Sequence, residues 1–286
     1  MRLAELYYQR FFLLATASLV CFALLGKHLS NSTALIVLVV GVVVLGLPHG
    51  ALDPLVATKA FAAANRRFSL TKFYIGYAGI AMAYGSLWVK FPMVGLVSFL
   101  IIAAFHFGSD WQARGSAVTR LAYGITLVTL PAVAHPAELA SIYATLGTSK
   151  AATIVAVSRI CAVVALVVAS SAAILRDSKH KSDLWELLTI AVGAVLLEPL
   201  IFFTCYFTLL HSPRHLFETA GLLGIESLRS VFLKTLPIVG ATLMMGVGAS
   251  FLLHAVPIRE KLLTLVFVGL ASLTVPHMLL EVFAEA

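Results

Sequence analysis

Ten apolar runs, each long enough or nearly long enough to cross a lipid bilayer, follow one another along the 286-residue chain. Backbone polar groups find no water inside a membrane, so each run must be a helix that pairs them internally. We therefore expect an all-α fold, a polytopic transmembrane helical bundle, with residues 1–286 forming a single integral membrane catalytic domain and no soluble domain. The expected spans are 7–26, 33–50, 72–89, 91–108, 118–135, 152–175, 184–198, 199–212, 235–256 and 262–281.

The composition agrees with a membrane protein. Hydrophobic residues make up 60% of the chain and charged residues only 12%, about half the charged fraction of a soluble domain. The net charge is +7, but the basic residues lie between the apolar runs and form no continuous stripe, so we expect no nucleic-acid partner. With ten spans, the loops on the N-terminal side hold 14 Lys and Arg and the opposite loops hold 5. This bias predicts a multi-pass protein of the cell (inner) membrane with both termini in the cytoplasm.

Residues 184–216 are the uncertain part of this topology. One straight helix of that length would measure about 50 Å, against a hydrocarbon core of about 30 Å. Glu198-Pro199 lies midway, and proline breaks or kinks a helix. We expect two short helices joined by a tight reversal. The alternative, a single kinked helix, gives nine spans and sends His211 and His215 to the face opposite His49.

Five of the nine histidines fall on one side of the ten-span topology, where they can approach one another. Ionisable residues at membrane depth are functional candidates by default, and this convergence is also the argument for ten spans. The five are His49, His106, His211, His215 and His277. We expect the others to be ordinary interfacial or hydrogen-bonded residues, namely His28, His135, His180 and His254.

Three of these histidines have a carboxylate four residues later. The motifs are PHGALD at 48–53, FHFGSD at 105–110 and PHMLLE at 276–281. On a continuous helix this spacing places acid and imidazole on one face, and a metal-bound histidine usually donates its other ring N–H to a carboxylate, carbonyl or water. Asp53 and Asp110 are therefore candidates for holding the histidine rings, although both could merely be interfacial caps.

The fourth motif is HSPRH at 211–215. Pro213 argues against a continuous helix here, because proline lacks the N–H that the helix needs. Ser212 is a suitable N-cap with Pro213 in the first helical position. We therefore expect His211 to end one helix and His215 to open the next.

Several imidazoles gathered at one site suggest a metal. Neutral imidazole suits Fe, Cu, Zn and Ni, and four neutral histidines leave a divalent ion its full charge and open coordination positions. Such a centre can bind O₂ beside an apolar substrate. Nothing in the chain suggests a thiolate, flavin or nicotinamide reductant site, so we expect no organic cofactor. The chemistry indicated is that of a dioxygenase, which needs no external electrons and acts through its metal.

The four motifs together resemble the Brp/Blh family of membrane β-carotene 15,15′-dioxygenases of bacteria and archaea, from the second apolar run to the last. The resemblance implies central cleavage of β-carotene by O₂ into two molecules of all-trans-retinal at a non-haem Fe(II), with the lipid bilayer as the surroundings. It implies His49, His106, His211 and His215 as iron ligands, and leaves His277 as a fifth ligand or a supporting residue. By family analogy, a retinal-binding rhodopsin is a functionally linked partner.

Three other classes compete with this interpretation. A membrane di-iron hydroxylase of carotenoids or lipids commonly needs about eight histidines for its two metals, more than the five that converge here. A b-type haem protein would pair histidines on facing helices. A metal or proton transporter would carry its polar residues near the middle of the membrane, on broken helices.

Overall fold

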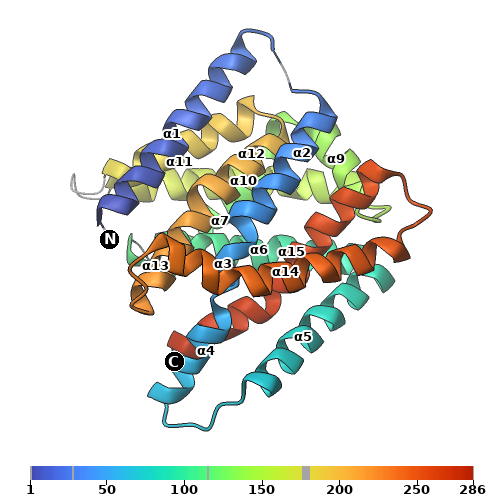
Figure 1. Ribbon diagram of the computed structural model, residues 1–286. Helices are drawn as coiled ribbons and strands as arrows, with labels where there is room; N and C mark the ends of the chain where they lie inside the picture. The colour runs from blue at the N-terminus through green and yellow to red at the C-terminus, as the bar shows by residue number, and fades with distance from the viewer. Residues whose placement is uncertain (1, 28, 115, 176–180, 286) are drawn as a thin grey trace.

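The computed structural model describes residues 2–27, 29–114, 116–175 and 181–285, which are helical apart from short connections (Figure 1). His28 and His180, two of the histidines expected to be ordinary, lie outside the described residues. In chain order the elements are α1 (Arg2–Leu24), α2 (Asn31–Gly41), η1 (Val42–Gly46), α3 (Leu47–Gly50), α4 (Asp53–Ala63), α5 (Leu70–Lys90), α6 (Pro92–Gly108), η2 (Ser109–Arg114), α7 (Ala117–Thr129), α8 (Pro131–Ala134), α9 (Pro136–Thr145), α10 (Ala151–Leu175), α11 (Lys181–Leu196), α12 (Pro199–Tyr206), η4 (Phe207–His211), α13 (Ser212–Leu222), α14 (Leu228–Leu252) and α15 (Ile258–Glu285).

The expected all-α membrane bundle is confirmed, but the count of ten spans is not. Within the described ranges, seven helical stretches are long and apolar enough to cross a membrane: Tyr7–Leu24, Asn31–Ala63, Pro92–Trp111, Ala117–Ala134, Ala151–Leu175, Leu228–Leu252 and Ile258–Ala284. Three expected spans are missing from this set. Helix α5 is long enough, but its tyrosines and glycines dilute its hydropathy. Helices α11 and α12 are each shorter than the roughly 20 residues that a span requires.

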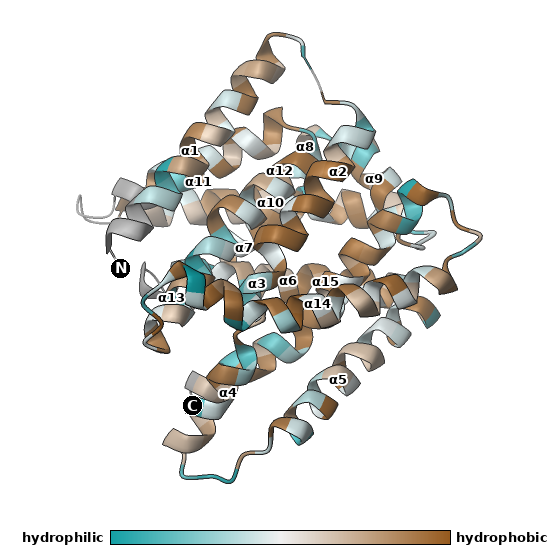
Figure 2. Cartoon of the chain, in the orientation of Figure 1, coloured by the Kyte–Doolittle hydropathy of each residue, from teal (hydrophilic) through white to brown (hydrophobic). Residues whose placement is uncertain are grey.

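Apolar residues cover most of the bundle, and polar residues concentrate in the connecting segments and in α13 (Figure 2). The chain reverses between α11 and α12, where Glu198 has an extended ψ of 141° and Pro199 opens the next helix. A Cβ added to Gly193 would lie 3.3 Å from the ring of Phe202, so α12 folds back onto α11. Two short helices with a tight reversal therefore form here, as the sequence predicts.

The expectation of a helix break at Pro213 is wrong. Helices α12 and α13 are joined through η4, a π-helical turn in which the N–H of Ser212 bonds to the carbonyl of Phe207, five residues back. Ser212 itself has helical dihedral angles of −62° and −43°. A proline ring normally clashes with the carbonyl four residues earlier. The wider π turn displaces those carbonyls, so the helix continues past Pro213.

A similar π-helical turn before a proline occurs in the first half of the chain. In η1 the N–H of Leu47 bonds to the carbonyl of Val42, and Pro48 follows directly. The two π turns pack against each other, because a Cβ added to Gly46 would lie only 2.6 Å from the ring of Phe207. Such turns are frequent at functional sites. Here each is followed closely by a proline and then by a histidine of the predicted site.

Helices α6 and α14 differ sharply in how they are packed. Helix α6 lies so close to α7 that a Cβ on Gly124 would overlap the carbonyl oxygen of Ala104. Helix α14 is the least buried of the spans, with 6% of its window inside the molecule. It crosses α15 on the near side of the bundle in Figure 1, while α5 runs along one edge. The site described next lies among α3, α6, α13 and α15.

Candidate metal centre

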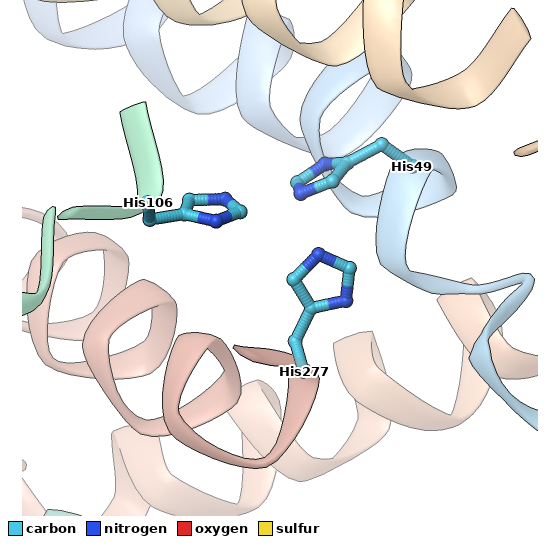
Figure 3. A group of neighbouring side chains, drawn as sticks. All are labelled: His49, His106 and His277. Atoms are coloured by element: carbon cyan, nitrogen blue, oxygen red, sulfur yellow. The ribbon is translucent and has the colours of Figure 1, made fainter. Parts of the chain in front are cut away.

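The five histidines singled out by sequence come together in the structure. The ring centroid of His49 lies 5.4–6.5 Å from those of the other four. The centroids of His106 and His211 are 4.7 Å apart, and those of His215 and His277 are 5.0 Å apart. Figure 3 shows three of the rings, from α3, α6 and α15, turned toward one common point. Residues separated by more than 220 positions in the chain thus form one cluster.

The spacing of the ring nitrogens suits a metal ion. Nitrogens of His49, His106 and His277 lie within 4.8 Å of one another, and the Nε2 atoms of His106 and His211 are 3.1 Å apart. Two imidazole nitrogens bound to the same ion at right angles, each about 2.1 Å from it, are about 3 Å apart. A second, overlapping group consists of His215, His277 and Glu281. The cluster could therefore hold a metal.

Hydrogen bonds to buried carboxylates hold two of the rings. The Nδ1 of His277 donates to Asp53 at 2.8 Å, and the hydroxyl of Tyr77 donates to the same carboxylate at 2.9 Å. Because a carboxylate oxygen only accepts, Nδ1 of His277 carries a proton, and in the neutral ring the lone pair is on Nε2. That Nε2 atom is buried and has no hydrogen-bond partner among the residues that the structure describes.

A matching arrangement holds His211. Its Nδ1 donates to Asp110 at 3.0 Å, and the hydroxyl of Tyr206 donates to the other oxygen of that carboxylate. His49 is held by a carbonyl instead, with its Nδ1 donating to the oxygen of Gly46 in the π turn. In all three histidines the Nδ1 proton is engaged, which leaves the Nε2 lone pair free to bind a cation.

The carboxylates of the motifs pair across helices rather than within them. Asp53 bonds to His277 instead of its own neighbour His49, and Asp110 bonds to His211 instead of His106. The reason is that neither helix continues from the histidine to the acid. Helix α3 ends at Gly50, and α6 changes to the 3₁₀ segment η2 after Gly108. Both carboxylates are about 5% exposed, so they are not interfacial caps.

The third motif keeps the expected spacing because α15 runs through it without a break. Glu281 lies 3.5 Å from the Nε2 of His277, one turn earlier on the same helix. Its carboxylate also lies 3.3 Å from the Nε2 of His215 and 3.6 Å from the Nδ1 of His106. Glu281 thus faces three of the five rings at the edge of the cluster.

A buried ion pair behind the cluster was missed by sequence reasoning, which assigned no role to Arg214. Its guanidinium lies 2.8 Å from Glu186 of α11 and donates to the carbonyl of Asp110 at 3.2 Å. The arginine and the glutamate are 2% and 3% exposed. The available signal was the position of Arg214 inside the HSPRH motif, between two histidines that both point inward.

An apolar cavity of about 390 Å³ lies against three of the histidines. Residues of α3, α5, α6, α14 and α15 line it, and its wall includes His49, His106 and His277. At the other end it reaches Tyr74 of α5 and Met245 of α14, which are 45% and 54% exposed. The cavity therefore connects the histidine cluster to the outer surface of the bundle between α5 and α14.

Two other histidines lie away from the cluster, as expected. The Nε2 of His135 bonds to the carbonyl of Val195, and the Nδ1 of exposed His254 bonds to the carbonyl of Phe251. Each ring thus has one nitrogen engaged by a backbone carbonyl outside the cluster.

Fold and site together define a polytopic helical membrane protein with a buried histidine cluster that could hold a metal beside an apolar cavity. The family described as beta-carotene 15,15′-dioxygenase matches residues 40–284 of the chain. A protein named beta-carotene 15,15′-dioxygenase, from the uncultured marine bacterium 66A03, is 31% identical over 248 residues, covering 84% of this chain and 90% of that protein. No solved structure matches the chain. The chain belongs to the β-carotene 15,15′-dioxygenase family, which confirms the predicted class of enzyme, a carotenoid cleavage dioxygenase.

Proposed function

We propose that this protein is a non-haem Fe(II) dioxygenase that cleaves the central 15,15′ double bond of β-carotene with O₂ and yields two molecules of all-trans-retinal. The observation that carries the proposal is the buried cluster of five imidazoles beside an apolar cavity open to the surface of the bundle. Residues 1–286 act as one catalytic domain in the cell (inner) membrane, with both termini in the cytoplasm. A retinal-binding rhodopsin is the proposed user of the product.

The contact between His106 and His211 supports a cation in the cluster. The proton of His211 is engaged by Asp110 through Nδ1, so its Nε2 presents a lone pair to the Nε2 of His106, 3.1 Å away. If His106 carries its proton on Nδ1, two lone pairs face each other. If it carries the proton on Nε2, its Nδ1 lone pair faces a Glu281 oxygen at 3.6 Å. A metal ion held by His106 and His211 would remove the conflict between these neutral rings.

The balance of charge also supports a bound cation in the cluster. In the described part of the chain, four carboxylates lie in or behind the cluster, and a single guanidinium, that of Arg214, lies among them. Neutral histidines add no positive charge, and buried charge is costly unless it is paired. A divalent cation offsets much of this excess. The carboxylates are those of Asp53, Asp110, Glu186 and Glu281.

The donor set is compatible with iron, which can take part in an oxygen-dependent reaction. Imidazole nitrogens suit Fe, Cu, Zn and Ni, and of these Zn has no redox chemistry. His49, His106, His211 and His215 would hold the ion, with His277 as the proposed fifth ligand. When bound, Fe(II) supplies the activation of O₂. Asp53 and Asp110 fix the orientation of two of the rings.

The other task of the protein is to position the polyene and to exclude water. β-Carotene dissolves in the bilayer, and the cavity offers it an apolar path from the surface between α5 and α14 to the histidines. Holding the substrate in a fixed orientation beside the metal site lowers the entropic part of the activation barrier. No general base is assigned, because the reaction removes no proton from the substrate.

A di-iron carotenoid or lipid hydroxylase is the second candidate, favoured by one specific observation. One oxygen of Glu281 lies 3.3 Å from His215 and the other lies 3.6 Å from His106, so this carboxylate could join a second ion to the first. The number of iron atoms bound per chain distinguishes the two functions. The proposed dioxygenase requires one iron atom per chain, and a di-iron hydroxylase requires two.

The test is expression in a bacterium engineered to accumulate β-carotene, followed by pigment extraction and chromatography. We expect the orange colour to fade and retinal to appear with the wild type. His106→Ala should abolish the change, whereas His254→Ala, which alters a histidine outside the cluster, should not. A well-expressed wild type that leaves β-carotene intact would contradict the proposed substrate.

A further inference from the structure

A second apolar cavity, of about 90 Å³, adjoins the larger one along α6 and α12. Its wall is formed mainly by α6, α7, α9 and α12, and among the described residues no histidine lines it. Nothing in the chemistry of the cluster accounts for it. Its location nevertheless connects it to the site, because it adjoins the larger cavity.

Side chains alone separate the two cavities. Phe99, Ala103 and Phe107 of α6 and Phe203 of α12 line both of them. The three residues of α6 are spaced by four and so form one stripe of the helix. The ring of Phe107 lies 4.8 Å from that of His211, so this dividing wall begins at the histidine cluster. Rotation of the phenylalanine rings in this wall would join the two cavities.

The length of the joined path suits one arm of the substrate. The second cavity extends along α6 as far as Leu96. The ten residues from Leu96 to His106 cover about 15 Å. This is of the order of the distance from the central double bond of a carotenoid to its end ring.

The proposed reaction cuts a symmetric molecule at its centre, so equal arms must extend in both directions from the histidines. The larger cavity accepts one arm and provides the opening between α5 and α14. We propose that the second cavity is the binding site for the far end ring of the carotenoid, and that it places the central bond at the histidine cluster. This inference rests on the proposed function and adds a site that determines both substrate length and cleavage position.

The inference is tested by narrowing the second cavity alone. Val128 of α7 is partly buried and lines the second cavity but not the first. Val128→Phe fills part of the space, and Val128→Leu is a milder variant in case the first folds poorly. Val118→Phe is the matched control, since it makes the same change on the same helix at a residue that is 69% exposed.

Two substrates are compared in detergent with purified protein. One is β-carotene, and the other is a shortened apocarotenal that has a ring at one end only and keeps the central double bond. The shortened molecule can bind with its short arm toward the narrowed cavity. We expect Val128→Phe to lower kcat/KM for β-carotene by about tenfold or more, and for the apocarotenal by less than about threefold. Val128→Leu should show the same selectivity to a smaller degree, and Val118→Phe should show none.

An equal loss with both substrates, or no loss with either, overturns the inference while leaving the proposed function intact. If the wild type cleaves neither carotenoid, the proposed function fails and the inference fails with it. Product analysis adds an independent check. Any residual cleavage of β-carotene by Val128→Phe should shift away from the central bond, because the molecule can no longer reach its full depth.

Discussion

The role of His277 can be tested through Asp53, which touches the ring but not the centre of the cluster. Asp53 accepts from the Nδ1 of His277 at 2.8 Å and from the hydroxyl of Tyr77 at 2.9 Å. Asp53→Asn keeps the shape of the side chain and removes its charge. If His277 binds the metal, its Nε2 becomes a weaker donor, because the negative charge no longer polarises the ring.

The expected size of the effect follows from this contact. Loss of an outer hydrogen-bond partner of a metal-bound histidine typically weakens metal binding by 10–100-fold, which corresponds to about 1.4–2.7 kcal/mol. Tyr77→Phe removes one hydrogen bond to the same carboxylate, worth about 0.5–1.5 kcal/mol. We therefore expect the Asn variant to weaken Fe(II) binding by at least tenfold, and the Phe variant by less.

The assay is anaerobic competition for Fe(II) between the purified protein and a chromogenic chelator. Asp110→Asn serves as the reference, because Asp110 supports His211 in the same way, at 3.0 Å. Thermal unfolding of the metal-free proteins separates an effect on binding from an effect on folding. If Asp53→Asn binds Fe(II) within twofold of wild type while Asp110→Asn is weakened, His277 is not a ligand and the reasoning is refuted.

Three further predictions concern stability and the metal. Arg214→Met should destabilise the protein by about 3–5 kcal/mol, because it removes the buried guanidinium that faces the carboxylates of Glu186 and Asp110. The double variant with Glu186→Gln should lose less than the sum of the two single changes in a thermal unfolding cycle. Gly124→Ala should lower the free energy of unfolding by about 1–3 kcal/mol or more, because the added Cβ forces α6 and α7 apart. At Gly246 an added Cβ meets no heavy atom of the described residues within 4 Å, so Gly246→Ala should be neutral or slightly stabilising. Equal melting temperatures for the two variants would contradict this. Dialysis against a strong chelator should abolish cleavage, and Fe(II) alone should restore it; full activity after removal of all metal would exclude a metal enzyme.

The helices and the convergence of the histidines were predictable because both depend on patterns along the chain. Hydropathy marks each apolar run. Because successive spans cross the membrane in opposite directions, the order of the runs predicts which span ends lie on the same side of the membrane. The reversal at Glu198-Pro199 was predictable from length and from proline. The count of spans was not, because α11 and α12 are individually too short to be classified by length.

The details of the site depend on relations between helices that sequence spacing does not encode. The chain breaks after His49 and changes helix type after His106, so the acids of those motifs turn toward other rings. Tyr77 and Tyr206, which hold the two aspartates, lie in separate helices and carry no local signal. The π turn before Pro213 is equally invisible, since it depends on packing against the opposite π turn.

The most direct test of the account is the product yield of purified protein loaded with Fe(II), supplied with O₂ and a limiting amount of β-carotene. We predict two molecules of retinal for each β-carotene consumed, with one iron atom bound per chain and no reaction when O₂ is withheld. Apocarotenals of unequal length would contradict central cleavage. Hydroxylated carotene, together with two iron atoms per chain, would contradict the dioxygenase assignment and support the dinuclear alternative.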